Sequence, residues 1–133
     1  MTSDAAVQSA IAHAEAILPG KPAPDGKRDP RWQAIIGVGR FIEERPEAVW
    51  RFALRWGKHA QLDLRMAVAT CLLEHLLEHH FELIFPRVRE AAMTSRRFAE
   101  TFEVCWRFGP ATVPENARRV DRLKRALARR RVR

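Results

Sequence analysis

The sequence predicts an all-α protein, a short right-handed α-solenoid in which about seven helices stack as pairs. Three observations lead to this prediction. Apolar residues recur with the three- and four-residue spacing of helices, and no stretch shows the alternation of a half-buried strand. Prolines and glycines separate the helical segments. Part of the helical pattern also repeats along the chain.

The first two helices are bounded by capping residues and by a proline-rich loop. An alanine-rich helix over residues 4–18 begins at the capping candidates Ser3 and Asp4 and ends at a Pro-Gly pair. Residues 19–30 contain four prolines and two glycines and are predicted to form a loop. Asp29 then caps a second helix, which starts with a proline and runs to Glu44, shortly before Pro46.

Five further helices follow from the same kinds of signal. Pro46 and Gly57 bound the third helix, and Asp63 and Ser95 are the predicted N-caps of the fourth and the sixth. The predicted ranges of these five helices are 46–57, 63–80, 82–93, 95–108 and 114–133.

The repeat has a period of 34 residues and relates the second, fourth and sixth helices. It aligns Asp29 with Asp63, and Arg31 with Arg65. Small residues also recur at one level, at Gly37, Cys71 and Cys105. Stacked helices approach most closely where side chains are small, so these positions are expected to lie at the contacts between repeats. Because a pair of helices cannot bury its apolar face alone, the repeats must stack.

These repeated segments resemble the second helix of HEAT repeats, in which an Asp and an Arg precede an alanine-rich run that ends in Leu. The resemblance covers residues 29–109 and implies an armadillo-type fold. Tetratricopeptide repeats share the 34-residue period, but Ile36 and Gly39 occupy that family's glycine and tyrosine positions.

The HEAT resemblance also implies a ladder of ion pairs between successive repeats. Its structural residues are Asp29, Arg31, Asp63 and Arg65. The third copy has Arg97 and Ala99 at the matching positions, so the ladder is expected to stop there.

The net charge of +8 lies entirely at the C-terminal end. Residues 118–133 contain nine basic residues and one acidic residue, whereas residues 1–117 contain fifteen of each. We therefore divide the chain into a helical-repeat body, residues 1–112, and a basic amphipathic capping helix and tail, residues 113–133. A field concentrated in this way attracts nucleic acid or an acidic protein surface.

The final helix is the strongest functional signal in the sequence. On an ideal helix, one arc is apolar and contains Val113, Ala117, Val120, Leu123 and Leu127. The opposite side presents four guanidinium groups, which we call the arginine stripe: Arg118, Arg122, Arg125 and Arg129. The planar fork of arginine binds phosphate or carboxylate through two bonds, so the stripe is predicted to bind an anionic partner.

A second candidate site lies on the fourth helix. His75, Glu78 and His79 match the short inverted zinc-protease motif, in which two histidines one turn apart hold the metal. His75 and His79 are therefore weak metal candidates, although no third ligand is evident and we expect no cofactor. The simpler interpretation is a polar groove on a mostly buried helix, with Glu74, His75 and Glu78 available to a partner.

Tryptophans suggest an alternative enzymatic function. DNA alkylation-repair glycosylases of HEAT-like architecture resemble the predicted fold, and they hold a damaged nucleotide with aromatic and acidic side chains on the concave surface. Trp32 and Trp106 would be the aromatic groove residues here, with Asp29 or Glu103 as the acid. Aromatic residues at helical spacing are more often core, so no catalytic role is assigned to them.

The expected function is a non-enzymatic binding or adaptor module. Its stripe would contact nucleic acid or an acidic partner, a protein partner is expected, and the end repeats leave self-stacking possible. The small repair enzyme and a pure protein–protein scaffold remain the alternatives. The sequence shows neither a membrane span nor a secretory signal, so we expect a cytoplasmic protein.

Overall fold

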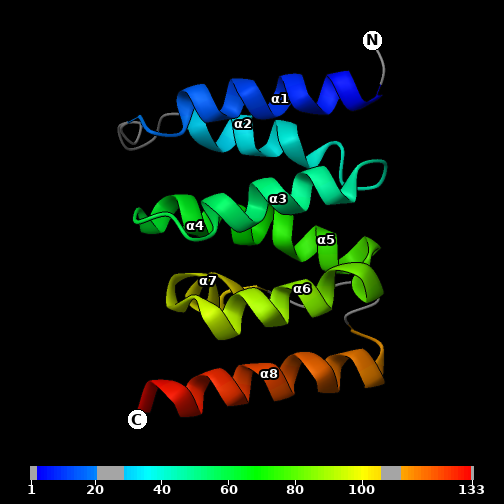
Figure 1. Ribbon diagram of the computed structural model, residues 1–133, viewed down its shortest axis with the longest axis vertical. Helices are drawn as coiled ribbons and strands as arrows, with labels where there is room; N and C mark the ends of the chain where they lie inside the picture. The colour runs from blue at the N-terminus through cyan, green and yellow to red at the C-terminus, as the bar shows by residue number, and fades with distance from the viewer. Residues whose placement is uncertain (1–2, 21–28, 106–111, 133) are drawn as a thin grey trace.

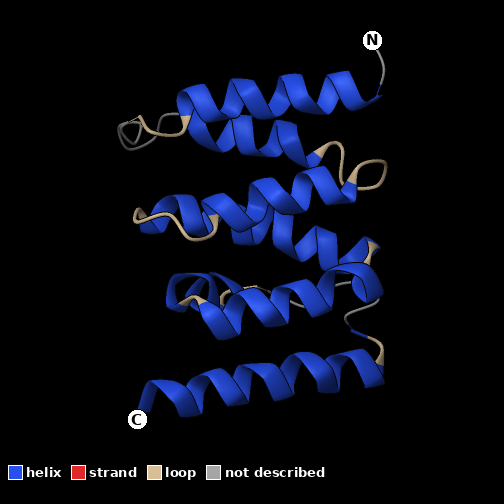
Figure 2. Cartoon of the chain, viewed as in Figure 1, coloured by secondary structure: helices blue, strands red, loops and turns tan. Residues whose placement is uncertain are grey.

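The computed structural model describes residues 3–20, 29–105 and 112–132, and all secondary structure in these ranges is helical (Figure 2). The all-α prediction is thus confirmed for the described residues. The π-turn Ala69–Leu73 joins α4 and α5 into one rod, so the described ranges contain seven rods. The helices are α1 (Ser3–Ile17), α2 (Pro30–Gly39), α3 (Pro46–Trp56), α4 (Leu62–Val68), α5 (Glu74–His79), α6 (Phe81–Thr94), α7 (Arg96–Glu103) and α8 (Pro114–Val132).

The rods stack in the order of the sequence, from α1 at one end to α8 at the other (Figure 1). Helices α1, α3, α6 and α8 form one layer, and α2, the α4–α5 rod and α7 form a second layer behind it. The second layer contains the three helices that the 34-residue repeat relates. Contacts run from α2 to α4 and the π-turn, and from these to α7, so each related helix touches the next.

The core lies between the two layers and continues through the stack. Helix α3 shows why the sequence forms such an element, because its apolar residues follow the helical spacing and leave arginines on the outer side. Trp50 and Trp56 of α3 are buried, and the Trp50 ring meets that of Phe98 edge-on at 5.7 Å. This contact ties α3 to α7 and links adjacent parts of the stack.

Two of the predicted N-caps have their expected geometry. An Asp29 carboxylate oxygen accepts the backbone N–H of Arg31 at 2.9 Å, and the Ser95 hydroxyl oxygen accepts that of Phe98 at 3.2 Å. The prediction for Asp63 is wrong, because Gln61 occupies the N-cap of α4. Asp63 lies in the first turn, where its carboxylate binds the Arg31 guanidinium of the preceding repeat unit. Asp63 therefore forms an ion pair with another helix instead of capping its own helix.

Helix ends were less predictable than helix identities. Helix α2 ends at Gly39 rather than at Glu44, because the following turn has bonds three residues apart, such as Phe41 N to Val38 O at 3.1 Å. Helix α7 ends at Glu103, and the predicted end at residue 108 lies outside the described residues.

The glycine at which α2 closely approaches the α4–α5 rod is Gly39 and not Gly37. A Cβ on Gly39 would lie 3.2 Å from both the Cys71 carbonyl oxygen and a Leu72 methyl, whereas one on Gly37 would meet no atom within 4 Å. At the next level, the Cys105 thiol lies 3.7 Å from the Ala69 carbonyl oxygen. Small residues do mark the contacts, but the glycine involved is two residues further along α2 than the repeat alignment predicts.

Candidate functional site

Helix α8 packs on the stack through a narrow apolar face. Val120, Leu123 and Leu127 are buried, as the helical wheel predicts. Two residues of the predicted arc differ: Ala117 is half-buried, and Val113, which precedes the first residue of α8, is 49% exposed. The apolar contact is mainly with α6.

Basic residues at the borders of this face hold α8 in place. Lys124 Nζ donates to the Cys105 carbonyl oxygen at 3.0 Å, and Arg130 Nη1 donates to the Met93 carbonyl oxygen at 2.7 Å. Arg119 pairs with Glu82 at 3.1 Å, and its guanidinium lies about 5 Å from the ring centres of Phe81 and Phe85. Part of the basic charge of α8 is therefore structural.

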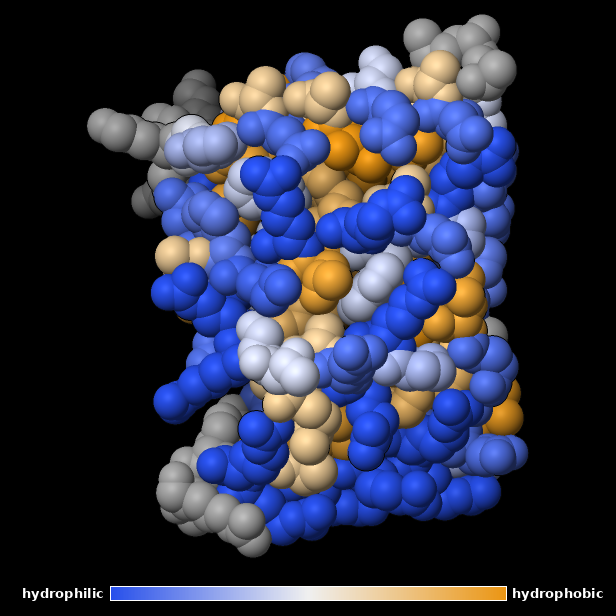
Figure 3. Space-filling view, viewed as in Figure 1, coloured by the Kyte–Doolittle hydropathy of each residue, from blue (hydrophilic) through white to orange (hydrophobic). Residues whose placement is uncertain are grey.

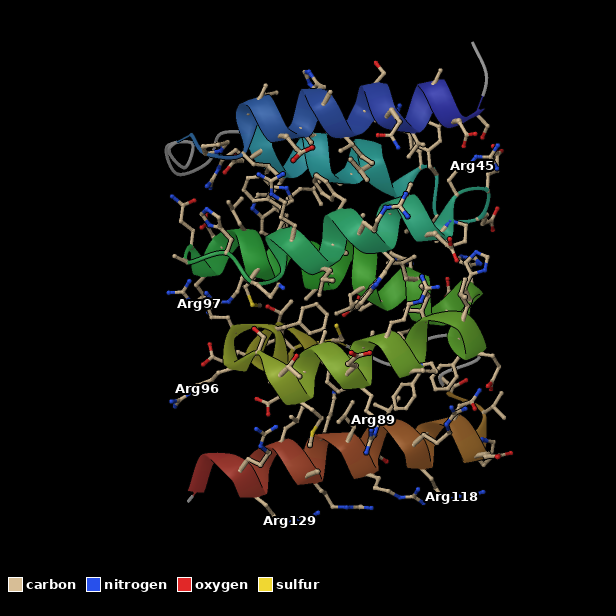
Figure 4. All side chains as sticks on the ribbon, in the orientation of Figure 1. Arg45, Arg89, Arg96, Arg97, Arg118 and Arg129 are labelled. Atoms are coloured by element: carbon tan, nitrogen blue, oxygen red, sulfur yellow. The ribbon has the colours of Figure 1, made fainter. Side chains whose placement is uncertain are left out.

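The arginine stripe is different, because all four of its side chains are exposed. Arg118 lies on the side of α8 that faces away from the stack (Figure 4), whereas Arg122 and Arg129 border a groove between α8 and α6. None of the four pairs with a carboxylate of any residue that the structure describes. The stripe extends over about 16 Å of helix axis, and the end of the molecule that carries it is a hydrophilic band (Figure 3). These guanidinium groups are therefore available to an external anion.

Two arginines of the second layer, Arg31 and Arg65, are buried and paired. Arg31 is 1% exposed; its guanidinium binds both carboxylate oxygens of Asp29, the Gln61 amide oxygen at 3.0 Å and the carboxylate of Asp63. The hydrogen bonds that the Arg31 guanidinium donates to Asp29 raise the pKa of Arg31 above its ordinary value, so the guanidinium stays charged despite its burial. The structure thus brings together three of the four predicted ladder residues.

Arg65 continues this series without an aspartate. It donates to the carbonyl oxygens of His59 and Ala60 at 2.9 and 3.2 Å and pairs with Glu100 of α7 at 3.1 Å. Glu100 lies three residues beyond Arg97, the position that aligns with Asp63. The expectation that the ladder stops before the third unit is therefore wrong, because a longer side chain one turn further along α7 reaches the same guanidinium.

The histidine cluster borders an open groove of about 460 Å³ between α2 and the α4–α5 rod. Glu78 Oε1 lies 3.0 Å from His79 Nε2 and 3.6 Å from His75 Nδ1, and Glu43 Oε1 lies 3.4 Å from His79 Nδ1. Among the described residues, no three His, Cys, Asp or Glu side chains are grouped so that they could hold a metal ion. The observed contacts are those of a polar surface network.

Glu74 does not belong to this surface. It is 5% exposed and lies close to Cys71 and Cys105, whose thiol pKa values are raised first by burial and then by the charge of Glu74. The wheel assumed a regular helix from residue 66 onward, whereas the π-turn that ends at Leu73 changes the rotation of every later residue. The exposed groups of α5 are consequently His75 and His79 rather than Glu74.

The candidate aromatic site is only partly described. Trp32 is half-buried and packs against the core, whereas Trp106 lies outside the described residues.

Both cysteine thiols are weak nucleophiles, because burial raises the pKa of Cys71 and, more strongly, that of Cys105. Nucleophilic chemistry at either thiol is therefore disfavoured.

No protein family, curated protein or solved structure matches the chain. No helix in the described ranges combines the length and the apolar character that a membrane crossing needs. The function is therefore inferred from the arrangement of the residues themselves.

Proposed function

We propose that this protein is a non-enzymatic helical-repeat binding module and that its arginine stripe contacts the phosphate backbone of a nucleic acid. The observation that supports the proposal is the state of these four arginines. They are exposed, they lie along one line of α8, and no carboxylate of the described residues neutralises them. Other arginines of the same helix are tied to the stack, so the exposure of the stripe is selective.

Backbone contact suits the stripe better than base recognition. Guanidinium groups bind phosphate oxygens through paired hydrogen bonds. Residues 114–132, which form α8, contain no aromatic residue, so this helix offers bases no stacking platform. We therefore expect affinity that depends strongly on salt and weakly on sequence.

The proposal is tested with a fluorescein-labelled DNA duplex and an RNA of matching sequence, titrated with the full chain over a salt series. If all four arginines meet phosphates, log Kd should change with log salt with a slope of magnitude about 3 to 4. The variant with Arg118, Arg122, Arg125 and Arg129 changed to Glu should lose this binding.

A matched control changes Arg40, Arg51, Lys58 and Arg97 to Glu. These side chains are also exposed, and this variant has the same net charge of zero as the stripe variant, because each set of changes removes the whole +8. The control should retain most of the affinity. Equal losses in both variants would show that total charge, rather than the stripe, determines binding.

For the body of the protein we propose the HEAT-like, right-handed arrangement. Three features support it: the 34-residue period, the arrangement of the related helices in one layer, and the Arg31 and Arg65 contacts between successive units. The glycosylase alternative has less support, because the carboxylate of Asp29 is occupied by Arg31. An experimental structure would test the handedness.

A further inference from the structure

A groove lies between α6 and α8, beside the arginine stripe. Its volume is about 390 Å³. The apolar part of its lining comes from both helices: Phe85, Pro86, Met93, Leu123 and Ala126. The remaining lining residues are four arginines: Arg89, Arg119, Arg122 and Arg129. The groove thus combines apolar side chains with cationic groups, and no carboxylate lies among its lining residues.

The cationic groups of the groove are largely available. Arg89 belongs to α6 and is exposed, and its side chain extends toward α8 (Figure 4). Neither it nor Arg122 or Arg129 pairs with a carboxylate of the described residues, whereas Arg119 is paired with Glu82. Three of the four guanidinium groups can therefore pair with negatively charged groups of a ligand.

We propose that this groove binds an acidic amphipathic segment of a protein partner, with apolar side chains in the groove and carboxylates on the arginines. The arginines require a partner segment with negative charge, and the apolar lining requires that one side of this segment be apolar. The groove shares Arg122 and Arg129 with the arginine stripe. The inference goes beyond the proposed function because it adds the apolar lining, Arg89 and a protein partner.

A peptide fits this groove better than a nucleic acid strand. Phe81 and Phe85 are buried and Arg119 covers their rings, so they offer bases no open aromatic face. The accessible apolar surface comes instead from aliphatic carbon, such as that of Met93 and Ala126. Aliphatic surface flanked by arginines is the complement of leucine-like side chains flanked by carboxylates.

The dimensions of the groove agree with a short helix. From Phe85 to Met93 the groove follows α6 for about 12 Å, since a helix rises about 1.5 Å per residue. Apolar residues at positions i, i+4 and i+7 of a ligand helix span about 10 Å. Two turns of an amphipathic helix therefore match the length of the groove.

The test uses a labelled synthetic helical peptide of about 16 residues, with leucines at i, i+4 and i+7 and glutamates on both flanks. The same residues in scrambled order provide a peptide of equal charge. The full-length protein should bind the amphipathic peptide at least about ten times more tightly than the scrambled one. Equal binding of the two peptides would overturn the proposal, because charge alone would then explain it.

Paired variants locate the binding site. Arg89→Glu should weaken peptide binding by about tenfold, whereas Arg118→Glu, outside the groove, should change it by less than about twofold. Ala126→Trp fills the groove and should also weaken binding by about tenfold, whereas Ala128→Trp, which does not line it, should not. Circular dichroism checks folding; if Ala126→Trp unfolds the protein, the exposed Arg89 and Arg118 pair decides the result.

The same variants separate this inference from the nucleic-acid proposal. Ala126→Trp should leave binding of the DNA duplex unchanged, whereas Arg118→Glu should weaken it. If a single-stranded oligothymidylate binds and Ala126→Trp abolishes that binding, the groove is a nucleic-acid site and the peptide proposal is wrong. If the wild-type protein binds the amphipathic peptide but does not bind the DNA duplex, the proposed function is wrong and the proposal for the groove stands.

Discussion

Arg31 and Arg65 in the second layer and the four arginines of the stripe on α8 use the same side chain in opposite ways. Arg31 and Arg65 are buried, and their guanidinium groups meet carboxylates or carbonyl oxygens of neighbouring units. The four arginines of the stripe are exposed and meet no described carboxylate. A buried cation must be paired because its desolvation is costly, whereas an exposed one keeps its hydration until a partner arrives. The local supply of acceptors therefore separates structural arginines from available ones.

The largest effect that this comparison predicts is on stability. Arg31→Met should lower the free energy of unfolding by about 3–5 kcal/mol, because Asp29, whose side chain is 17% exposed, is left without the cation that compensates its charge, and Asp63 loses the same partner. Arg118→Met should change it by less than about 0.5 kcal/mol. Urea unfolding of both variants measures the difference, and similar values for the two would remove the distinction between the regions.

The next effect concerns the attachment of α8. Leu123→Ala should cost about 2–3 kcal/mol, because it removes one of three buried side chains on that face. The loss should be local, so hydrogen exchange should accelerate in α8 and remain slow in α2 and α3. Equal acceleration throughout the chain would mean that α8 and the body unfold as one unit.

Arg65→Met tests whether the ladder weakens along the stack. We expect a loss of about 1–2 kcal/mol, smaller than at Arg31, because the carboxylate partner of Arg65, Glu100, is 40% exposed and stays hydrated after Arg65 is removed, whereas Arg31 also pairs with Asp29, which is only 17% exposed. The variant Glu100→Gln keeps a hydrogen-bond acceptor and should cost less. A larger loss of stability at Arg65 than at Arg31 would contradict the expectation that the ion pairs weaken along the stack.

The smallest effect involves an uncharged interior group. Burial raises the pKa of the Cys105 thiol well above its ordinary value of 9.0. Above pH 9 the unfolded chain releases this proton while the folded chain keeps it, so stability falls as pH rises, by at most about 1.4 kcal/mol per unit. Between pH 9 and 10, wild type should lose about 1 kcal/mol more than Cys105→Ala in urea unfolding. Identical pH profiles would show that the thiol does not contribute.

Local features were predictable from the sequence, and relations between helices were less so. The all-α class and the capping roles of Asp29 and Ser95 follow from capping residues, prolines and helical spacing. The two faces of α8 were also predictable, because the amphipathicity of one helix depends on that helix alone.

Three features could not be predicted because they depend on packing. The π-turn has no sequence signal here, and it moved Glu74 into the interior. Glu100 replaces the missing aspartate from a position outside the repeat alignment. Arg89 joins the groove beside α8 only because α6 and α8 lie next to each other, and periodicity does not show which helix faces lie side by side.

The π-turn also bears on how this chain tolerates insertions and deletions. One widened turn absorbs an extra residue, so the segments before and after it both keep their places in the stack. Both neighbouring helices touch this turn, through Gly39 at the Cys71 carbonyl and Cys105 at the Ala69 carbonyl. Deleting one residue there would rotate α5 by about 100° and turn its leucines away from the core. An insertion or deletion at this turn therefore changes which side of α5 faces the core, and substitutions elsewhere cannot easily compensate for that rotation.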